Sequence, residues 1–513
     1  MLNWLEKWSD LHPEKPVLYA QGKCWSYGEL AREVERTAAK LQKLGVGPGS
    51  RVALLGRNSV DWVTAACAVF WRGAVLVPLP WRATEAEIDD RIRRAKPDLV
   101  VTEDAIFDRR DAICVEALKE DVKTSMTCPA SPVEPGELMT ILFTSGTTGR
   151  PKMVGLTAGN HLASAEASAR RLARDDDDLW LCCLPMYHTG GLAILLRTLI
   201  YGTAFELVHS FDADHLLKLL RTQPITVASF VPTMVHRLLR QLEGCDEVLN
   251  SSLRAVLVGG GPTSAQEIRR ARRRGLPVVP TYGMTEAASQ IATLSPKTPS
   301  KYLDTVGRPL EGMELRLESP ADDAPAMIWV RGPMVTDGYL DGPASEDAVA
   351  STPDEAEPRF QDGWFSTGDF GTIDDEGRLQ IHHRRSERIV SGGENVDPRE
   401  VEALLREVDG VAQAAVVGVD DPEWGEVVAA AVTREGEVGE GHTDTALIEG
   451  LKERCRRHLA GFKVPRRWVV VDELPTTATG KIRRVEIRNQ WTTPSPGGGG
   501  AISKATRSED VST

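Results

Sequence analysis

The chain has few of the features that mark a secreted, membrane or metal-binding protein. Its eight cysteines are scattered over 513 residues and form neither a CxxC pair nor a His/Cys cluster with the spacing of zinc ligands. No apolar run reaches about 18 residues, so no membrane span is expected. Residues 1–7 lack a basic segment followed by an apolar core, so no signal peptide is expected. Reduced thiols in a cytoplasmic protein are the simplest interpretation.

Positive charge is also scarce. The chain has 74 acidic and 61 basic residues, a net charge of −13 and a calculated pI near 5.4. This balance disfavours nucleic acid or an anionic membrane as the main partner. An acidic protein that binds a phosphorylated ligand must gather positive charge locally, so basic residues beside glycine-rich loops carry extra weight.

Up to about residue 286, helical segments alternate with short apolar segments, which predicts layered α/β sheets. We expect helix N-caps at Ser26, within a capping box, and at Thr233. The expected helices are 26–44, 60–72, 85–95, 160–172, 192–201, 233–242 and 264–274. The expected strands are 51–55, 74–79, 98–102, 138–143, 179–184, 225–230, 254–258 and 278–280.

The pattern changes near residue 306. Short strand-like segments with Gly, Pro and Asp turns predict a small β subdomain up to residue 381. A charged segment then precedes a compact α+β unit, with helices expected at 398–407 and 446–459 and strands at 412–417, 427–433 and 468–471. We therefore expect a large α/β N-terminal core (1–384), a smaller mobile α+β domain (385–490) and a disordered tail (491–513).

One stretch combines glycine, hydroxyl and basic residues directly after a predicted strand: residues 142–152 read LFTSGTTGRPK. Glycines let backbone N–H groups approach a ligand closely, and successive N–H groups form a concave anion site. Pro151 prevents a helix from following, so this is not a Walker A loop. A triphosphate fits the pattern, and a flexible surface turn is the alternative. The expected phosphate-binding residues are Thr144, Ser145, Gly146, Thr147, Thr148, Gly149 and Lys152.

Further special residues stand at the carboxyl ends of predicted strands. These are His188, the run Gly259-Gly260-Gly261 and the run Tyr282-Gly283-Met284-Thr285-Glu286. Ligands bind at such ends in open α/β sheets, so we expect one shared site.

These motifs, in this order and over roughly residues 1–490, resemble the acyl-adenylate-forming superfamily. The resemblance implies ATP, Mg²⁺ and coenzyme A as ligands. It implies that Tyr282 stacks on adenine beside Gly283, that Thr285 contacts the α-phosphate and that Glu286 binds Mg²⁺. A carboxylate beside a phosphate site needs an intervening cation, and magnesium suits oxygen ligands. The alternative for Glu286 is an ordinary acid at a helix N-terminus.

The resemblance extends to the C-terminal third. It implies that Asp369 and Arg384 bind ribose, that Ser386 is the hinge, and that Gly392 and Gly393 pass beside the pantetheine arm. Lys481, in a Thr-Gly-Lys-Ile segment, would pair with the substrate carboxylate and the α-phosphate. In isolation each of these residues could belong to an ordinary turn. The family usually has Asp where this chain has His383, so the energetics of the hinge are expected to differ.

Closer likeness points to the branch that activates an aromatic acid carrying a second carboxylate. Arg197 lies in the apolar segment 193–200, and a charge is rarely buried without a partner. We expect Arg197 to meet the carboxylate that is not activated; the alternative is a place on the solvent face of its helix. His188, Thr189 and Gly260 are expected at the acyl pocket, and a satisfied core histidine is the alternative for His188.

The resulting prediction is a two-step ligase that forms an acyl-adenylate and then a CoA thioester. Lys481, Thr285, Glu286 and His188 are its expected catalytic residues. Another aromatic or fatty acid as substrate, a carrier protein as acceptor, and a non-catalytic nucleotide-binding role are the alternatives. The expected partners are small molecules, and a homo-oligomer is left open.

Overall fold

The computed structural model describes residues 3–103, 112–118, 128–144, 151–243, 249–261, 263–318, 325–340, 360–384, 389–391, 394–421, 424–435, 444–459, 461–476, 482–492 and 506–509. The chain divides into two compact units. The first contains Met1–Arg316, Trp329–Ser366 and Ile373–Leu379, and the second contains Leu317–Ile328, Thr367–Thr372 and Gln380–Thr513. The predicted domain limits, with a boundary at residue 385, stay a prediction.

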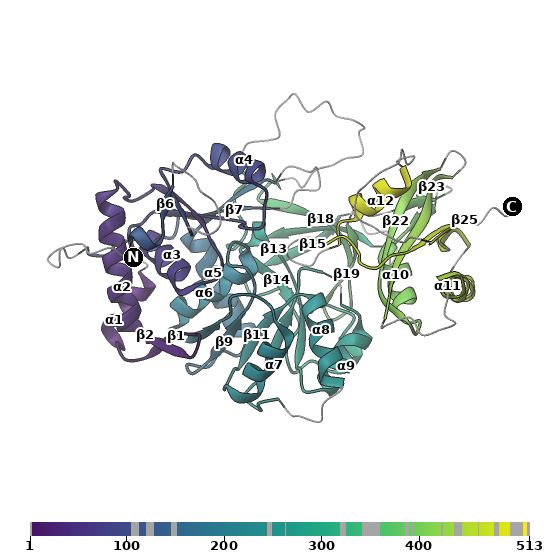
Figure 1. The fold of residues 1–513 in the computed structure, drawn as a ribbon, viewed down its shortest axis with the longest axis horizontal. Helices are drawn as coiled ribbons and strands as arrows, with labels where there is room; N and C mark the ends of the chain where they lie inside the picture. Colours follow the sequence, from purple (N-terminus) through teal and green to yellow (C-terminus); the bar gives the residue numbers. More distant parts are fainter. Residues whose placement is uncertain are drawn as a thin grey trace. The chain divides into compact units, whose positions relative to one another are not determined.

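Two large sheets form the framework of the first unit (Figure 1). One has the order β6-β5-β3-β4-β7-β8 and is parallel except for β8. Its strands are β3 (Arg51–Leu55), β4 (Val75–Leu79), β5 (Leu99–Thr102), β6 (Ile113–Cys114), β7 (Leu138–Phe143) and β8 (Met153–Thr157).

The other sheet has the order β14-β13-β12-β11-β9-β10-β1-β2, and only its outermost strands β14 and β2 run antiparallel to their neighbours. Its strands are β1 (Pro16–Ala20), β2 (Lys23–Ser26), β9 (Leu179–Cys182), β10 (Ala204–Leu207), β11 (Val227–Phe230), β12 (Ala255–Val258), β13 (Val278–Met284) and β14 (Ser289–Thr293). Parallel strands need crossover connections, and the helices supply them.

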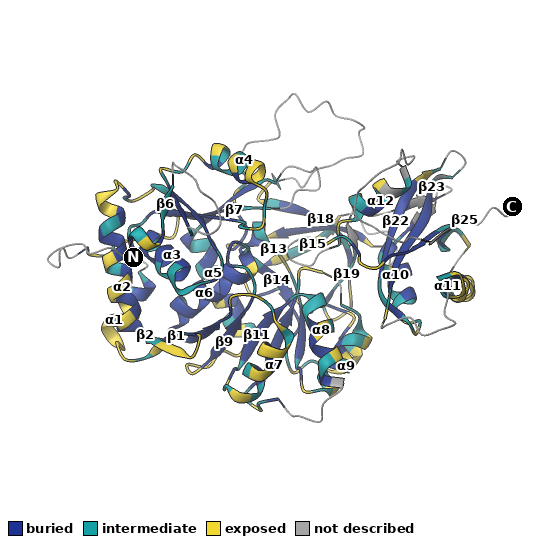
Figure 2. Cartoon of the chain, viewed as in Figure 1, coloured by how far each residue is buried: buried dark blue, intermediate teal, exposed yellow. Residues whose placement is uncertain are grey.

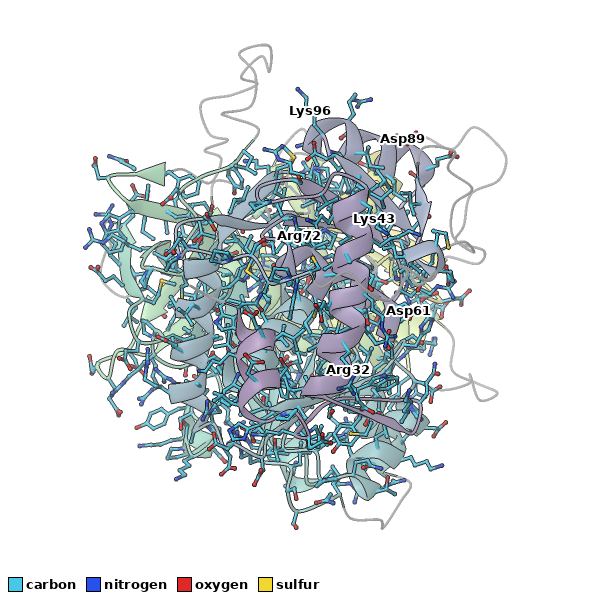
Figure 3. All side chains as sticks on the ribbon, turned by 90° about the vertical axis from the view of Figure 1, so that its left-hand side faces the viewer. Arg32, Lys43, Asp61, Arg72, Asp89 and Lys96 are labelled. Atoms are coloured by element: carbon cyan, nitrogen blue, oxygen red, sulfur yellow. The ribbon has the colours of Figure 1, made fainter. Side chains whose placement is uncertain are left out.

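Helices cover both sheets. They are α1 (Trp4–Leu11), α2 (Tyr27–Lys43), α3 (Val60–Trp71), α4 (Glu85–Ala95), α5 (Ala158–Leu172), α6 (Thr189–Tyr201), α7 (Ala213–Thr222), α8 (Pro232–Glu243) and α9 (Ala265–Arg273). The capping box predicted at Ser26 is present, because its side chain accepts from the N–H of Glu29 and Glu29 accepts from the N–H of Ser26. Along α2, Leu30, Val34 and Leu41 are buried, while Arg32 and Lys43 lie on the solvent side (Figure 3).

The hydrophobic core of the first unit lies between the sheets and these helices. All residues of β9 and β11 are buried, and exposed residues collect on the outer faces of α2 and α7 (Figure 2). This distribution explains why the parallel strands have continuous apolar sequences instead of an alternating pattern.

A five-stranded sheet confirms the predicted β subdomain, and its strands contribute to both units. Its order is β15-β16-β18-β17, with β19 paired to β18. The strands are β15 (Glu314–Glu318), β16 (Ala326–Arg331), β17 (Phe360–Gln361), β18 (Trp364–Ile373) and β19 (Leu379–Arg384).

The second unit also contains the predicted α+β fold. Its sheet has the order β21-β20-β23-β24-β25, with β22 paired to β23. Two separate hydrophobic clusters form its core, one containing Leu405 and the other containing Ile487. The elements are β20 (Ile389–Ser391), β21 (Glu394–Val396), α10 (Pro398–Arg406), β22 (Val411–Asp421), β23 (Gly425–Arg434), α11 (Asp444–His458), β24 (Arg467–Val470), α12 (Arg484–Thr492) and β25 (Thr506–Glu509).

Several elements differ from prediction. Thr233 is not an N-cap: it lies inside α8, which begins at Pro232, a residue suited to the first helical turn. Helix α6 begins at Thr189, before the two glycines that lower its helix propensity. Strands β8, β10 and β14 were not expected. Within the tail whose composition predicts disorder, β25 pairs antiparallel with β24, which would otherwise be the edge strand of the sheet.

In the part of the chain that the structure describes, every helix is too short or too polar to cross a membrane. The cysteines described there, Cys24, Cys67, Cys114, Cys128, Cys182, Cys183 and Cys455, are all free thiols.

Candidate active site

The predicted phosphate loop joins β7 to β8. Its central residues Ser145–Arg150 lie outside the described residues, whereas Thr144 and Lys152 at its two ends are described. The backbone N–H of Thr144 donates to the carbonyl oxygen of Lys152 at 3.0 Å, and Phe143 pairs with Met153. The loop is therefore closed at its base by the antiparallel strands, with Lys152 at the carboxyl end of β7.

Lys152 and Glu286, predicted for phosphate and magnesium, are brought together by a third residue. The ammonium nitrogen of Lys152 lies 4.8 Å from the ring centroid of Tyr339. The hydroxyl of Tyr339 donates to Oε1 of Glu286 at 2.8 Å. Sequence reasoning missed Tyr339, because its contacts join segments that are far apart in the chain and no motif marked it.

The backbone around Glu286 is also fixed. Glu286 lies in the 3₁₀ turn η2 (Thr285–Ala287) that follows β13. Its carbonyl oxygen accepts the N–H of Thr336 at 2.8 Å, and the hydroxyl of Thr336 donates to the carbonyl oxygen of Gly155 at 2.6 Å. The turn that carries Thr285 and Glu286 is thus tied to β8, which begins next to Lys152.

Glycine is required at Gly283. A β-carbon there would lie 1.8 Å from the carbonyl oxygen of Ser289, where the pairing of β13 with β14 is irregular. Only a residue without a side chain allows the two backbones to approach this closely. The adjacent Tyr282 is half-buried near the end of β13, and its predicted stacking on adenine stays a prediction.

The glycine run after β12 lies against the same segment. Strands β12 and β13 pair in parallel, with Val258 opposite Pro280. A β-carbon at Gly259 would lie 3.0 Å from the carbonyl oxygen of Thr281, and Gly260 has φ +79°. Gly260 and Gly261 are exposed, so their backbone groups are accessible.

His188 stands at the N-cap of α6, where its side chain makes no capping hydrogen bond. Its ring lies 4.4 Å, centroid to centroid, from the ring of Tyr187. The preceding turn is held by Asn58, which accepts the N–H of Met186 at 3.0 Å and donates to the carbonyl oxygen of Leu184 at 2.9 Å. Asn58 was not predicted, and it connects the carboxyl end of β3 to the turn that presents His188.

Two other predicted acyl-pocket residues are buried polar side chains in α6. Among the described residues, the buried hydroxyl of Thr189 has no hydrogen-bond partner. Arg197 is only 3% exposed, which excludes the solvent-face alternative left open by the helix periodicity. Its guanidinium lies 5.4 Å from the ring centroid of Trp180, and its Nε and Nη2 have no partner in the described part of the chain.

The surroundings of Arg197 are electrostatically unusual. Burial lowers the pKa of its guanidinium. Burial and the charge of Arg197 lower the pKa of His161 to about 3, so His161 is neutral at physiological pH and hydrogen-bonds to Thr140 Oγ1 at 2.9 Å. Trp180 donates its indole N–H to Ser229 Oγ at 3.1 Å. Among the described residues, the guanidinium of Arg197 is thus surrounded by the neutral side chains of Trp180 and His161 and keeps N–H groups that could donate to an anion.

The remaining predicted residues belong to the second unit. Asp369 is buried in β18, and its N–H donates to Thr367 Oγ1 at 3.1 Å. Arg384 ends β19, and its side chain is not described. Ser386, Gly392, Gly393 and Lys481 lie outside the described residues. Ser391, which precedes Gly392, pairs with Glu394, and Thr476 pairs with Ile482, the residue after Lys481.

The donor set suits magnesium delivered with a nucleotide. Within the described ranges, no group of three or more His, Cys, Asp or Glu side chains could hold a metal ion by itself. Magnesium is commonly bound by one or two carboxylates, waters and substrate phosphates, so a single Glu286 beside Lys152 and the phosphate loop fits it. The hydroxyl of Tyr339 contacts one carboxylate oxygen of Glu286.

The chain belongs to the family of AMP-binding enzymes. Residues 5–340 match the AMP-binding enzyme family, and residues 400–481 match the AMP-binding enzyme C-terminal domain. It is 37% identical over 494 residues to the 2-succinylbenzoate–CoA ligase of Bacillus licheniformis, covering 94% of this chain and 99% of that protein.

Two solved structures of o-succinylbenzoate CoA synthetase from Bacillus subtilis are similar over nearly their full length. The complex with the acyl-adenylate intermediate has a TM-score of 0.84 at 32% identity, covering 97% of this chain and 99% of that chain. The complex with ATP and a magnesium ion has a TM-score of 0.83 at 32% identity, covering 96% and 99%. The fold and the predicted superfamily are thereby confirmed.

Proposed function

We propose that the chain is an AMP-forming 2-succinylbenzoate–CoA ligase of menaquinone biosynthesis, using ATP, Mg²⁺ and coenzyme A. The observation that carries the choice of acid is Arg197, a buried guanidinium beside Trp180 whose Nε and Nη2 have no partner among the described residues. The substrate has two carboxylates, one to be activated and one to be recognised. The similarity to 2-succinylbenzoate–CoA ligases supports the same choice.

In the first half-reaction one carboxylate of the acid attacks the α-phosphorus of ATP, the bond from this phosphorus to the bridging oxygen breaks, and pyrophosphate leaves. A carboxylate is already a nucleophile, so no general base is required. The chain contributes position and charge stabilisation. The phosphate loop and Lys152 hold the phosphates, Thr285 contacts the α-phosphate, and Lys481 neutralises developing charge.

Other residues bind the parts of the nucleotide and the acid that do not react. Tyr282 stacks on adenine, Asp369 and Arg384 bind the ribose, and Glu286 binds magnesium. The metal supplies charge neutralisation on the phosphates when bound. His188 and Thr189 line the acyl pocket with the backbone of Gly260.

In the second half-reaction the CoA thiolate attacks the acyl carbon, the acyl carbon–oxygen bond to AMP breaks, and AMP leaves. The C-terminal domain is proposed to turn about Ser386, withdrawing Lys481 and presenting Gly392 and Gly393 to the pantetheine arm. Free thiols support a cytoplasmic location.

The test is thioester formation by the purified protein with ATP, Mg²⁺, CoA and 2-succinylbenzoate, followed by mass spectrometry. Benzoate, coumarate and a medium-chain fatty acid are assayed in parallel. We expect a strong preference for the dicarboxylate. Thioester from another acid would keep the chemistry and remove the pathway assignment. ATP–pyrophosphate exchange without thioester would indicate a carrier protein as the acceptor.

A further inference from the structure

Tyr339 contacts both charged residues on the phosphate side of the candidate site. Its ring faces the ammonium group of Lys152 at 4.8 Å, and its hydroxyl donates to Oε1 of Glu286 at 2.8 Å. Lys152 directly precedes β8, Glu286 lies in the turn after β13, and Tyr339 lies near the end of the segment 325–340. A cation, an aromatic ring and a carboxylate are therefore connected in series within the first unit.

The position of Tyr339 is fixed by its own backbone. Tyr339 forms an antiparallel bridge with Val154, and the N–H of Leu340 donates to the carbonyl oxygen of Met153 at 2.9 Å. The ring packs edge-on against Phe360 at 5.7 Å, centroid to centroid. These contacts hold the phenol in one place next to the residue that follows the phosphate loop.

The same segment holds the backbone of Glu286. Thr336 donates its N–H to Glu286 and its hydroxyl to Gly155 of β8. Residues 336–340 therefore connect the phosphate-loop strand to both the main chain and the side chain of Glu286. A displacement of this segment would move the two charged groups together.

We propose that Tyr339 is a positioning residue that sets the relative placement of Glu286 and Lys152 before the nucleotide binds. This rests on the proposed function, which assigns magnesium to Glu286 and phosphate to Lys152. The hydroxyl occupies Oε1 and so orients the carboxylate, which leaves the other oxygen for the metal. The ring attracts the ammonium group by a cation–π interaction and limits the conformations of a long, flexible side chain.

The two roles can be separated by two substitutions. Tyr339→Phe removes the hydroxyl that donates to Glu286 and keeps the ring that faces Lys152. Tyr339→Leu removes both. Tyr302 offers a matched control outside the site, because its hydroxyl donates to Glu376 Oε1 at 2.8 Å and Lys301 lies 4.5 Å from its ring centroid.

The experiment is calorimetric titration of ATP into each variant at several magnesium concentrations, with Mg²⁺-free titrations as the reference. For Tyr339→Phe we expect the magnesium concentration giving half of the maximal ATP affinity to rise by about fivefold or more. Mg²⁺-free ATP affinity should be unchanged. For Tyr339→Leu both quantities should worsen. Tyr302→Phe should change neither.

The inference would be overturned if Tyr339→Phe needed the same magnesium concentration as the wild type for half of the maximal ATP affinity. It would also be overturned if Tyr302→Phe raised this concentration as much as Tyr339→Phe does. Thermal melting of Tyr339→Phe verifies folding, so loss of the Leu variant through misfolding leaves the test intact. Wild-type thioester formation is measured on the same preparation. Its absence would remove the proposed function, whereas its presence with an unchanged Phe variant would remove only the role of Tyr339.

Discussion

The helix periodicity alone allows Arg197 to lie either on the solvent face or on the buried face of α6, and the packing of α6 shows that it is buried. The side chain is 3% exposed beside Trp180, and its Nε and Nη2 have no hydrogen-bond partner among the described residues. Leaving such groups unsatisfied costs stability, which is why we propose a role for Arg197 in binding. Burial could not be read from composition, because it depends on what α5 and β9 place around this turn of the helix.

Replacing Arg197 by Leu should change the KM for 2-succinylbenzoate but not the KM for ATP. We expect the KM for 2-succinylbenzoate to rise roughly 10- to 100-fold, because a charge-assisted contact is lost. The KM for ATP should be unchanged, and steady-state kinetics with each substrate varied in turn measures both. Arg197→Lys, which keeps the charge without the planar fork, should fall between. Equal increases in both KM values would contradict the assignment.

At Gly283, the addition of a β-carbon alone is expected to disrupt the local structure. Gly283→Ala would place a β-carbon 1.8 Å from the Ser289 carbonyl oxygen, so the β13–β14 pair must separate. We expect ATP binding to be lost and the free energy of unfolding to fall by about 1–3 kcal/mol. Calorimetry and urea unfolding measure these. Gly47→Ala is the control, because nothing lies within 4 Å of its β-carbon position; similar losses there would contradict this reason.

At the scale of elements, local sequence signals correctly predicted the helices that have strong caps and clear hydrophobic periodicity. The capping box at Ser26 and the range of α4 were predicted correctly because their signals lie within the element itself. Strand β10 was missed, and its pairing depends on β1, far away in the chain, as well as on β9. Glycine within the first turn of α6 has a tertiary reason: a β-carbon at Gly191 would lie 2.4 Å from the carbonyl oxygen of Pro185.

The site followed the same rule. Motif residues at strand ends, such as Lys152 and Glu286, could be selected from the sequence. Asn58 and Tyr339, which join those ends, could not, because each acts through contacts between distant segments. The sequence around a residue shows that it stands at the end of a strand, but it does not show which distant residue will contact that strand end in the fold.

The contact between α5 and β7 should make stability depend on pH. His161 of α5 bonds to Thr140 of β7, and its pKa falls from 6.5 to about 3 in the folded state. Between these values the unfolded chain binds a proton that the folded chain does not, so the free energy of unfolding should fall as the pH decreases. His161→Gln should flatten this acid limb in urea unfolding across the range; an unchanged slope would exclude His161 as its source.

At the scale of the whole molecule, the chain has two compact units with separate hydrophobic clusters. Separate cores predict separate unfolding transitions. Motifs in both units match the same family, so the chemistry proposed here requires both.

Core truncations should therefore act on one transition at a time. Leu405→Ala in α10 and Leu181→Ala in β9 each remove a fully buried side chain. We expect each to destabilise its own unit by about 2–5 kcal/mol and to leave the other transition in place. Differential scanning calorimetry measures both. A single transition that shifts with either variant would show that the units unfold cooperatively.

The buried guanidinium of Arg197 also has a consequence for the lifetime of the protein. A ligand that binds only the folded chain raises its free energy of unfolding in proportion to the logarithm of ligand concentration. A dicarboxylate that satisfies Arg197 would do so before any ATP is consumed. Proteolysis acts on the small unfolded fraction, so abundance would follow the supply of substrate. A cell that makes little of the acid would then keep little of the enzyme, without any change in transcription.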